Sequence, residues 1–210
     1  MGARDFLIAI GSDHGGYRLK EDLKPFLLAK GYQVMDLGTN NTQSVDYPDF
    51  AQAVAHAVMD GSAGAGILLC TTGIGVSIAA NKVHGIRASL CHDPLSARLA
   101  REHNQANVLC LGGGIIGLRL AEEIVEVWLQ TPCSDQERHR RRVAKIERIE
   151  QDPALGRSEG KRREWSSSLT DTRGQAHRRI AADLIDKGHP PTLSPRRKQG
   201  GRCLSRKELL

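Results

Sequence analysis

Aromatic side chains and long apolar runs are both scarce in this sequence. Phe, Trp and Tyr make up 4% of its 210 residues, which argues against an aromatic-rich β-sandwich. No apolar run reaches the ~18 residues that a membrane-spanning helix requires. The first residues, Met1 to Phe6, place acid beside base without a long apolar stretch. We therefore expect no signal peptide and no membrane partner.

Cysteine is also sparse, and its pattern excludes two common uses. The five cysteines are Cys70, Cys91, Cys110, Cys133 and Cys203. Their number is odd, and their spacing matches neither a metal-binding motif nor a disulfide framework. We expect a reduced chain in the cytoplasm rather than a disulfide-stapled secreted protein.

The last part of the chain has few hydrophobic residues and twice as many basic as acidic ones. Residues 1–150 contain 16 Lys and Arg against 17 Asp and Glu, whereas residues 151–210 contain 14 against 7. Only 15 residues of this C-terminal segment are hydrophobic, too few to offset the entropy lost on ordering it. We predict one folded domain at 1–150, followed by a basic, disordered extension at 151–210.

Strand and helix patterns alternate along the first 150 residues. Short apolar runs predict five strands, at 6–10, 33–37, 65–70, 86–90 and 108–111. Helical spacing of apolar residues predicts helices at 17–30, 50–59, 76–82, 94–102, 118–129 and 135–149. Such alternation favours a parallel sheet covered on both faces. The predicted fold is a Rossmann-like three-layer α/β/α domain with a five-stranded parallel sheet.

Three polar or glycine-rich loops follow predicted strands, at 12–16, 70–75 and 112–117. In parallel sheets the carboxyl ends of the strands share one edge, and ligands bind there. We therefore expect these three loops to form one site.

Cys70 begins the sequence Cys-Thr-Thr-Gly-Ile-Gly between a predicted strand and a helix. Amide N–H groups at the start of that helix would stabilise a thiolate, or an oxyanion formed beside it. Gly73 and Gly75 would let the backbone approach a ligand closely. A buried structural cysteine on a tight turn explains the same pattern, so the spacing alone leaves both interpretations open.

Three further groups have a structural as well as a chemical interpretation. Asp13 and His14 could transfer a proton or bind phosphate, or Asp13 could cap the following helix. His103 could act as acid or base, or lie at a helix C-terminus because a positive charge is favoured there. Arg138 and Arg142 share a helix face that suits a phosphate clamp, although such charge runs usually form a solvated face.

The residues from Gly112 to Gly117 formally satisfy the dinucleotide pattern G-x-G-x-x-G. No second strand ending in an acidic residue follows, as a ribose contact would require. We favour close backbone packing over nucleotide binding as the reason for these glycines.

Several of these segments together resemble one enzyme family. They are IAIGSDHGG at 8–16, VDYP at 45–48, CTTGIGVSIAANK at 70–82, GIRA at 85–88, HN at 103–104 and the Arg-His…Arg-Val pattern at 138–143. In this order they resemble ribose-5-phosphate isomerase type B, in the family that also contains galactose-6-phosphate isomerase subunits. The resemblance covers about residues 6–150.

The resemblance implies an aldose–ketose isomerase that interconverts ribose 5-phosphate and ribulose 5-phosphate through a cis-enediolate, without metal or organic cofactor. Cys70 matches the family cysteine that moves a proton between neighbouring carbons. Thr72 matches the hydroxyl that stabilises the enediolate. His103, together with Asp13, matches the positions that open the furanose ring.

The resemblance also implies the groups that bind the substrate and its phosphate. They match His14, Tyr47, Thr71, Gly73, Gly75, Asn81, Asn104, Arg138 and Arg142. In relatives the site is completed across a dimer interface. The resemblance therefore implies a cytoplasmic homodimer or homotetramer with shared active sites, acting in the pentose phosphate pathway.

Two positions depart from the family pattern, because Thr71 stands where relatives often have Gly and Gly114 where many have Arg. They leave open an isomerase of allose or galactose 6-phosphate, and also a sugar-phosphate-binding subunit without catalysis. The basic extension would attract nucleic acid without sequence preference, but no aromatic or fold motif accompanies its charge. We expect a phosphorylated sugar, not nucleic acid, as the main partner.

Overall fold

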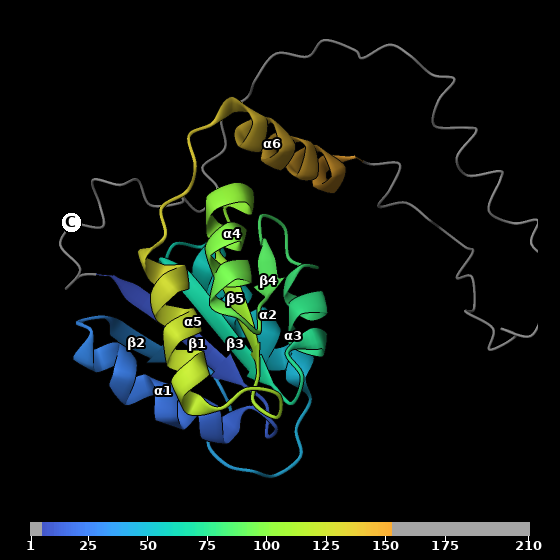
Figure 1. The fold of residues 1–210 in the computed structure, drawn as a ribbon. Helices are drawn as coiled ribbons and strands as arrows, with labels where there is room; N and C mark the ends of the chain where they lie inside the picture. Colours follow the sequence, from blue (N-terminus) through green and yellow to red (C-terminus); the bar gives the residue numbers. More distant parts are fainter. Residues whose placement is uncertain (1–5, 153–210) are drawn as a thin grey trace, which may run out of the picture. The chain divides into compact units, whose positions relative to one another are not determined.

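One parallel sheet with helices on both faces makes up most of residues 6–152, the part of the chain that the computed structural model describes (Figure 1). Its strands are β1 (Leu7–Ser12), β2 (Gln33–Asp36), β3 (Ala65–Cys70), β4 (Ala88–Leu90) and β5 (Val108–Gly112). They lie in the order β2-β1-β3-β5-β4, and all neighbouring pairs are parallel. The predicted five-stranded parallel sheet is confirmed.

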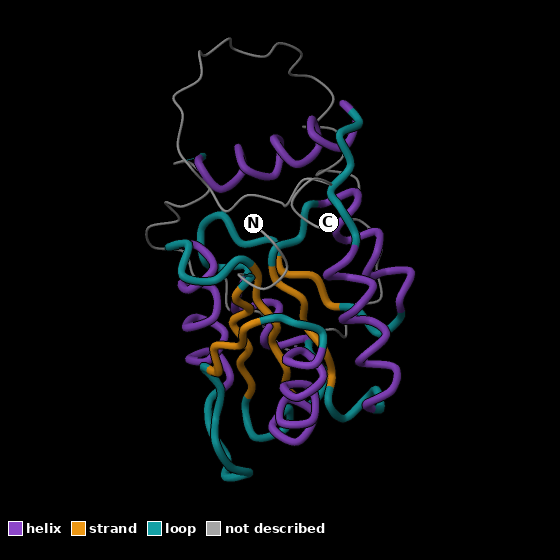
Figure 2. The backbone as a smooth tube through the Cα atoms, turned by 90° about the vertical axis from the view of Figure 1, so that its left-hand side faces the viewer, coloured by secondary structure: helices purple, strands orange, loops and turns teal. Residues whose placement is uncertain are grey.

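The helices form two layers, one on each face of the sheet (Figure 2). Helices α1 (Tyr17–Ala29), α4 (Pro94–Asn104) and α5 (Leu118–Gln130) pack on one face. Helices α2 (Tyr47–Met59) and α3 (Ile74–Ala80) pack on the other. The three layers that the sequence predicts are therefore present.

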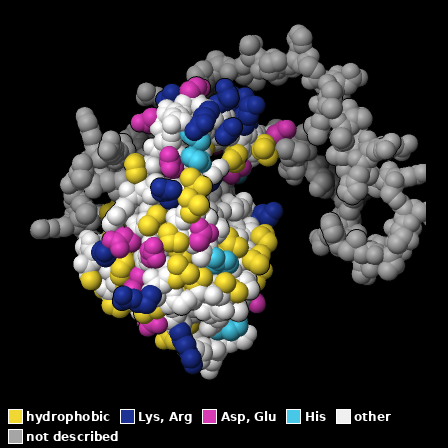
Figure 3. Space-filling model, viewed as in Figure 1, with side chains coloured by type: hydrophobic (Ala, Val, Ile, Leu, Met, Phe, Trp, Pro, Cys, Tyr) yellow, Lys and Arg dark blue, Asp and Glu magenta, His cyan; other side chains and the backbone are white. Residues whose placement is uncertain are grey.

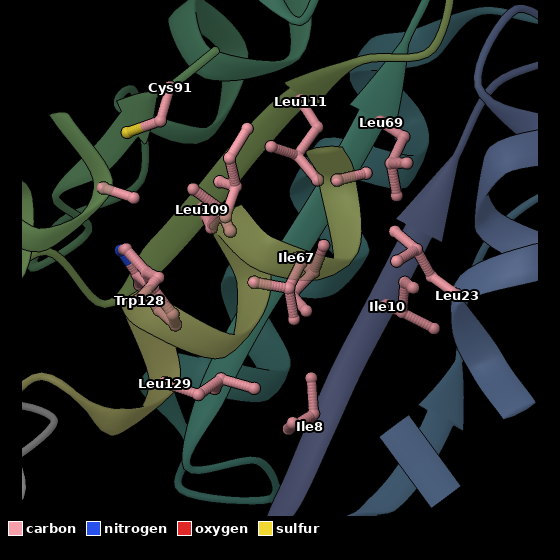
Figure 4. Packing of buried hydrophobic residues seen from close by; sticks show 14 of the residues in the cluster. Ile8, Ile10, Leu23, Ile67, Leu69, Cys91, Leu109, Leu111, Trp128 and Leu129 are labelled. Atoms are coloured by element: carbon pink, nitrogen blue, oxygen red, sulfur yellow. The ribbon is translucent and has the colours of Figure 1, made fainter. Parts of the chain in front are cut away.

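The strand side chains divide between two hydrophobic cores, because successive residues of a strand point to opposite faces. Ile67, Leu69 and Leu109 belong to the core beneath α1, α4 and α5 (Figure 4). Leu68 and Cys70 belong to the core beneath α2 and α3. The alternation thus directs the Cys70 side chain to the α2–α3 side at the end of β3.

A last helix, α6 (Glu137–Gln151), lies at the amino edge of the sheet, because α5 has carried the chain back to that edge. Near its start, the His139 ring stacks on His103 at the end of α4. Near its end, the Glu150 carboxylate accepts a hydrogen bond of 3.0 Å from the Gly85 N–H, just before β4. These contacts attach both ends of α6 to the domain.

Most element boundaries differ from the sequence prediction by one to three residues, and two of these differences have a physical reason in the structure. Helix α2 begins at Tyr47 rather than at residue 50, because Pro48 in the first turn lacks only an N–H that has no helical partner there. Strand β4 begins at Ala88 rather than at residue 86. The Arg87 N–H instead donates to the Asn107 side chain at 2.8 Å. The pairing of β4 with β5 therefore starts only at Ala88.

The predicted disordered extension at 151–210 lies outside the described residues apart from its first two positions. Among the residues that are described, no helix combines the length and the apolar character needed to cross a membrane.

Candidate active site

Three loops meet at the carboxyl edge of the sheet, after β1, β3 and β5. The Gly113 N–H donates to the Cys70 carbonyl at 2.8 Å, and the Gly114 N–H donates to the Thr71 carbonyl at 2.8 Å. Gly15 lies directly against Thr71, since a Cβ added to Gly15 would be 2.1 Å from Thr71 Oγ1. The expected convergence of these loops is confirmed. The loops meet between the neighbouring strands β1 and β3, which are followed by helices on opposite faces of the sheet, α1 on one face and α3 on the other. Ligands usually bind at this position in parallel sheets.

Cys70 ends β3 at the centre of this junction. Its side chain is 5% exposed, and its Sγ accepts a hydrogen bond of 3.0 Å from the Gly73 N–H. A donated N–H stabilises negative charge on sulfur. Gly73 has φ +76°, a left-handed conformation that favours glycine. The turn therefore directs a backbone amide at the thiol.

Asp13 holds the loop after β1. Its Oδ1 accepts hydrogen bonds from the N–H groups of Gly15 at 2.9 Å and Gly16 at 3.0 Å. The carboxylate thus braces the turn that leads into α1, close to the capping role considered from the sequence. The neighbouring His14 accepts the Val45 N–H at Nδ1, at 3.2 Å. A neutral His14 ring therefore carries its proton on Nε2, where it can be donated to an anion.

Thr72, Gly75 and Tyr47 surround the turn that follows Cys70. Thr72 Oγ1 accepts the Ile74 N–H at 3.3 Å. The Tyr47 ring covers Gly75, where an added Cβ would lie 2.7 Å from Tyr47 Cζ. The structure therefore brings together Cys70 and most of the residues that the sequence assigned to it, including Thr71 and Gly73.

Asn81 has a structural role in this arrangement. Its Nδ2 donates to the carbonyls of Ser77 and Ala88, both at 2.9 Å, and its Oδ1 accepts the Ala88 N–H at 2.8 Å. The side-chain amide thereby fastens the end of α3 to the start of β4. It lies at the opposite end of α3 from Cys70, so we omit Asn81 from the substrate site proposed below.

The remaining predicted residues lie at the other edge of the sheet. Helix α4 begins after β4, and its 11 residues carry the chain about 16 Å back towards the amino edge. His103 and Asn104 are the last two residues of α4. Arg138 and Arg142 are exposed on α6, where Lys and Arg side chains gather (Figure 3). Within one chain, His103 and the two arginines therefore do not meet Cys70.

His139 lies beside this second group, and the sequence did not single it out from the surrounding basic run. The residue is 3% exposed, and its ring stacks on His103 with centroids 4.1 Å apart and planes 7° apart. Burial, aided by His103 and the positive charges of Arg138 and Arg142, lowers the pKa of His139 below the ordinary 6.5. The four-residue spacing to Val143, which is also buried, was the available signal for an inward position.

The glycine triplet that begins at Gly112 packs against the loop of Cys70. A Cβ added to Gly112 would lie 2.8 Å from the Thr72 carbonyl oxygen, and one added to Gly114 would lie 3.1 Å from Thr71 Cγ2. Close backbone packing therefore accounts for these glycines. Within residues 6–152, no group of three or more His, Cys, Asp and Glu side chains is arranged to hold a metal ion.

Comparison with known proteins agrees with this geometry. The model of the Ribose/Galactose Isomerase family matches residues 8–146. Ribose-5-phosphate isomerase B of Escherichia coli is 47% identical over 144 residues, which cover 69% of this chain and 96% of that protein. The D-erythrulose-4-phosphate isomerase of Pectobacterium atrosepticum is 49% identical over 123 residues, covering 58% of this chain and 81% of its own.

Solved structures show the same fold. Ribose-5-phosphate isomerase B of Clostridium thermocellum is 52% identical and superposes with a TM-score of 0.68, covering 70% of this chain and 98% of that one. The type B enzyme of Trypanosoma cruzi is 44% identical with a TM-score of 0.67, covering 69% and 98%.

The Rossmann-like sheet and the thiol at its carboxyl edge, together with these relatives, define an enzyme of the aldose–ketose isomerase class. More narrowly, the chain belongs to the ribose/galactose isomerase family, as its motifs indicated.

Proposed function

We propose that this enzyme interconverts ribose 5-phosphate and ribulose 5-phosphate, with Cys70 as the base that moves the proton. The proposal depends above all on the position of the Cys70 sulfur. It lies at the junction of three loops and accepts a backbone N–H at 3.0 Å, which places a hydrogen-bond donor beside the atom that would take the proton. The relatives named ribose-5-phosphate isomerase B support the choice of the pentose ester.

The reaction needs a base that gives back the proton it takes. The Cys70 thiolate removes the proton from C2 of the open aldose, and the electrons of that bond form the C1–C2 double bond of a cis-enediolate. The aldose carbonyl electrons meanwhile move onto O1, and the proton of the C2 hydroxyl passes from O2 to O1. The resulting thiol then protonates C1 and leaves the ketose carbonyl at C2. The negative oxygens formed in between require hydrogen-bond donors, for which the Thr72 hydroxyl and the amides of the Thr71–Gly75 turn are the nearest candidates.

Phosphate recognition requires donors and positive charge. At the carboxyl edge His14 offers its Nε2–H, because its Nδ1 already accepts the Val45 N–H. The strongest cations assigned from the sequence, Arg138 and Arg142, are instead on α6 at the far edge. One chain therefore supplies the thiol but lacks the arginines beside it.

A second copy of the chain resolves this separation. In a twofold dimer, each amino-edge group of His103, Asn104, Arg138 and Arg142 completes the carboxyl-edge site of the other copy. Exposed apolar side chains near the carboxyl edge support such an interface. They are Ile74, Ile78, Leu95 and Ile115, each more than half exposed in one chain.

The role of Cys70 is tested with Cys70→Ser and Cys70→Ala. Both should lower kcat on ribose 5-phosphate by on the order of 100-fold or more, as loss of a general base does, with an unchanged circular dichroism spectrum. Rates on ribose 5-, allose 6- and galactose 6-phosphate identify the preferred sugar. A Cys70→Ala enzyme with wild-type turnover would remove the thiol from the mechanism, and a faster hexose reaction would overturn the pentose assignment.

The shared site is tested by mixing two inactive variants. Cys70→Ala and His103→Ala chains, unfolded together and refolded, form hybrid dimers that contain one intact site. An equal mixture should recover about a quarter of wild-type activity, since half of the randomly paired dimers carry one functional site of two. Mixing that restores no activity would show that each chain completes its own site.

Ring opening by His103 is tested with a sugar that cannot close a ring. In erythrulose 4-phosphate the terminal oxygen is esterified, so no furanose forms. If His103 serves only to open the ring, His103→Ala should lower kcat on ribose 5-phosphate by on the order of 100-fold and affect the tetrose ester much less. Equal losses on both substrates would contradict this role.

A further inference from the structure

His139 makes two contacts that join residues assigned to the substrate site. Its ring stacks face to face on His103, 4.1 Å between centroids and 7° from parallel. The His103 side chain is 35% exposed, so one face is covered by His139 while the ring stays accessible to a ligand. A stacked neighbour of this kind restricts the ring plane of the exposed histidine.

The second contact is with Arg138. The Arg138 Nε–H donates to His139 Nε2 at 3.1 Å, which orients a guanidinium that is otherwise exposed. This hydrogen bond requires a neutral His139 ring, because a protonated imidazole has no acceptor.

The surroundings of His139 favour that neutral form. Glu102 and His103 face it from α4, and Arg138 and Arg142 face it from α6. Burial is the main cause of the lowered pKa of His139, and the two fixed positive charges and the second imidazole outweigh the single carboxylate. The buried ring is therefore kept uncharged and able to accept.

We propose that His139 is a positioning residue that holds His103 and Arg138 in the geometry with which they meet the sugar phosphate of the second copy. Stacking fixes the plane of the ring-opening imidazole, and the accepting nitrogen fixes the phosphate-binding guanidinium. This inference rests on the proposed function, in which those two side chains act on ribose 5-phosphate. In this role His139 acts through His103 and Arg138.

Two substitutions separate the two contacts. His139→Phe keeps a flat ring against His103 but removes the acceptor for Arg138, and it also removes a buried Nδ1 without a partner among the described residues. The KM for ribose 5-phosphate should rise about fivefold with kcat retained, because the loss of one hydrogen bond weakens binding by about this factor. His139→Gln keeps an acceptor near the Nε2 position but loses the stack. Its kcat should fall about tenfold with KM retained, because His103 is still present but no longer held in the orientation that catalysis requires.

Nuclear magnetic resonance of His103 gives a readout that does not depend on activity. The ring-current shift of the His103 ring protons should persist in His139→Phe and disappear in His139→Gln. Unchanged His103 shifts in His139→Gln would overturn the stacking role, and so would equal changes of kcat and KM in both variants, which indicate a purely structural residue. If the shifts behave as expected but wild-type enzyme does not isomerise ribose 5-phosphate, the proposed substrate fails while the positioning of His103 stands.

Discussion

Replacing Gly73 by alanine measures how tightly the turn beside Cys70 is packed. Gly73 has φ +76°, and an added Cβ would lie 2.4 Å from Leu90 Cδ1 and 2.9 Å from the carbonyl carbon of Leu111. The left-handed conformation costs a non-glycine residue about 1 kcal/mol. Moving packed strand backbone costs about 2 kcal/mol more. We therefore expect Gly73→Ala to lower the free energy of unfolding by about 3 kcal/mol.

Gly31 provides the matched control. It has φ +87°, but an added Cβ would meet no atom within 4 Å. Gly31→Ala should therefore show only the conformational cost of about 1 kcal/mol. Urea unfolding followed by circular dichroism compares the two variants, and equal losses of stability would refute the steric part of the reasoning.

The same pair of variants links the turn to the chemistry. The Gly73 N–H donates to Cys70 Sγ, and an added Cβ would force this peptide to move. Turnover by Gly73→Ala should fall about tenfold or more, because a catalytic donor is displaced, whereas Gly31→Ala should match wild type. Full activity in a destabilised Gly73→Ala enzyme would show that this N–H does not serve the thiolate.

Three other perturbations test the core and its charges. Lys20 is 1% exposed and bonds to Asp36 at 2.5 Å, so Lys20→Ala should cost about 2 kcal/mol by urea unfolding; a neutral effect would show that Lys24 replaces it. Trp128 is fully buried beneath the Arg101 guanidinium, 4.7 Å from its ring, so Trp128→Phe should lower stability by about 2 kcal/mol, and an unchanged Tm would contradict this. Because the pKa of folded His139 lies below 6.5, the unfolded chain binds the extra proton first, and stability should fall as pH drops below 6.5. His139→Phe should weaken that slope, and an identical slope would assign it to other groups.

The fold was accessible from the sequence because its signals are local. Ala65–Cys70 is an apolar run without a polar residue, and it forms the central strand at the predicted bounds. Helix α1 begins at Tyr17 as predicted and ends one residue before the expected Lys30. The start of β4 was missed because a contact between segments decides it: the Arg87 N–H is taken by the side chain of Asn107, just before β5.

The candidate site was only partly accessible. Cys70, Thr72 and Gly73 are close together in sequence. An apolar strand that ends shortly before a glycine predicts the turn that they share. The side-chain amide of Asn81 looked equally available, yet both its N–H donors and its oxygen are bonded to backbone groups of Ser77 and Ala88. His139 looked like part of a solvated basic run, and only the packing of α6 on α4 shows that its ring is buried against His103.

The order of hydrophobic and glycine residues by itself determined the parallel sheet and the loop that presents the thiol, because both depend on periodicity and on the conformations open to individual residues. Only the tertiary structure decided that His103 and the arginines lie at the opposite edge from Cys70. The arginines reach that edge because α6 packs against the end of α4, a contact between distant segments that no local pattern encodes.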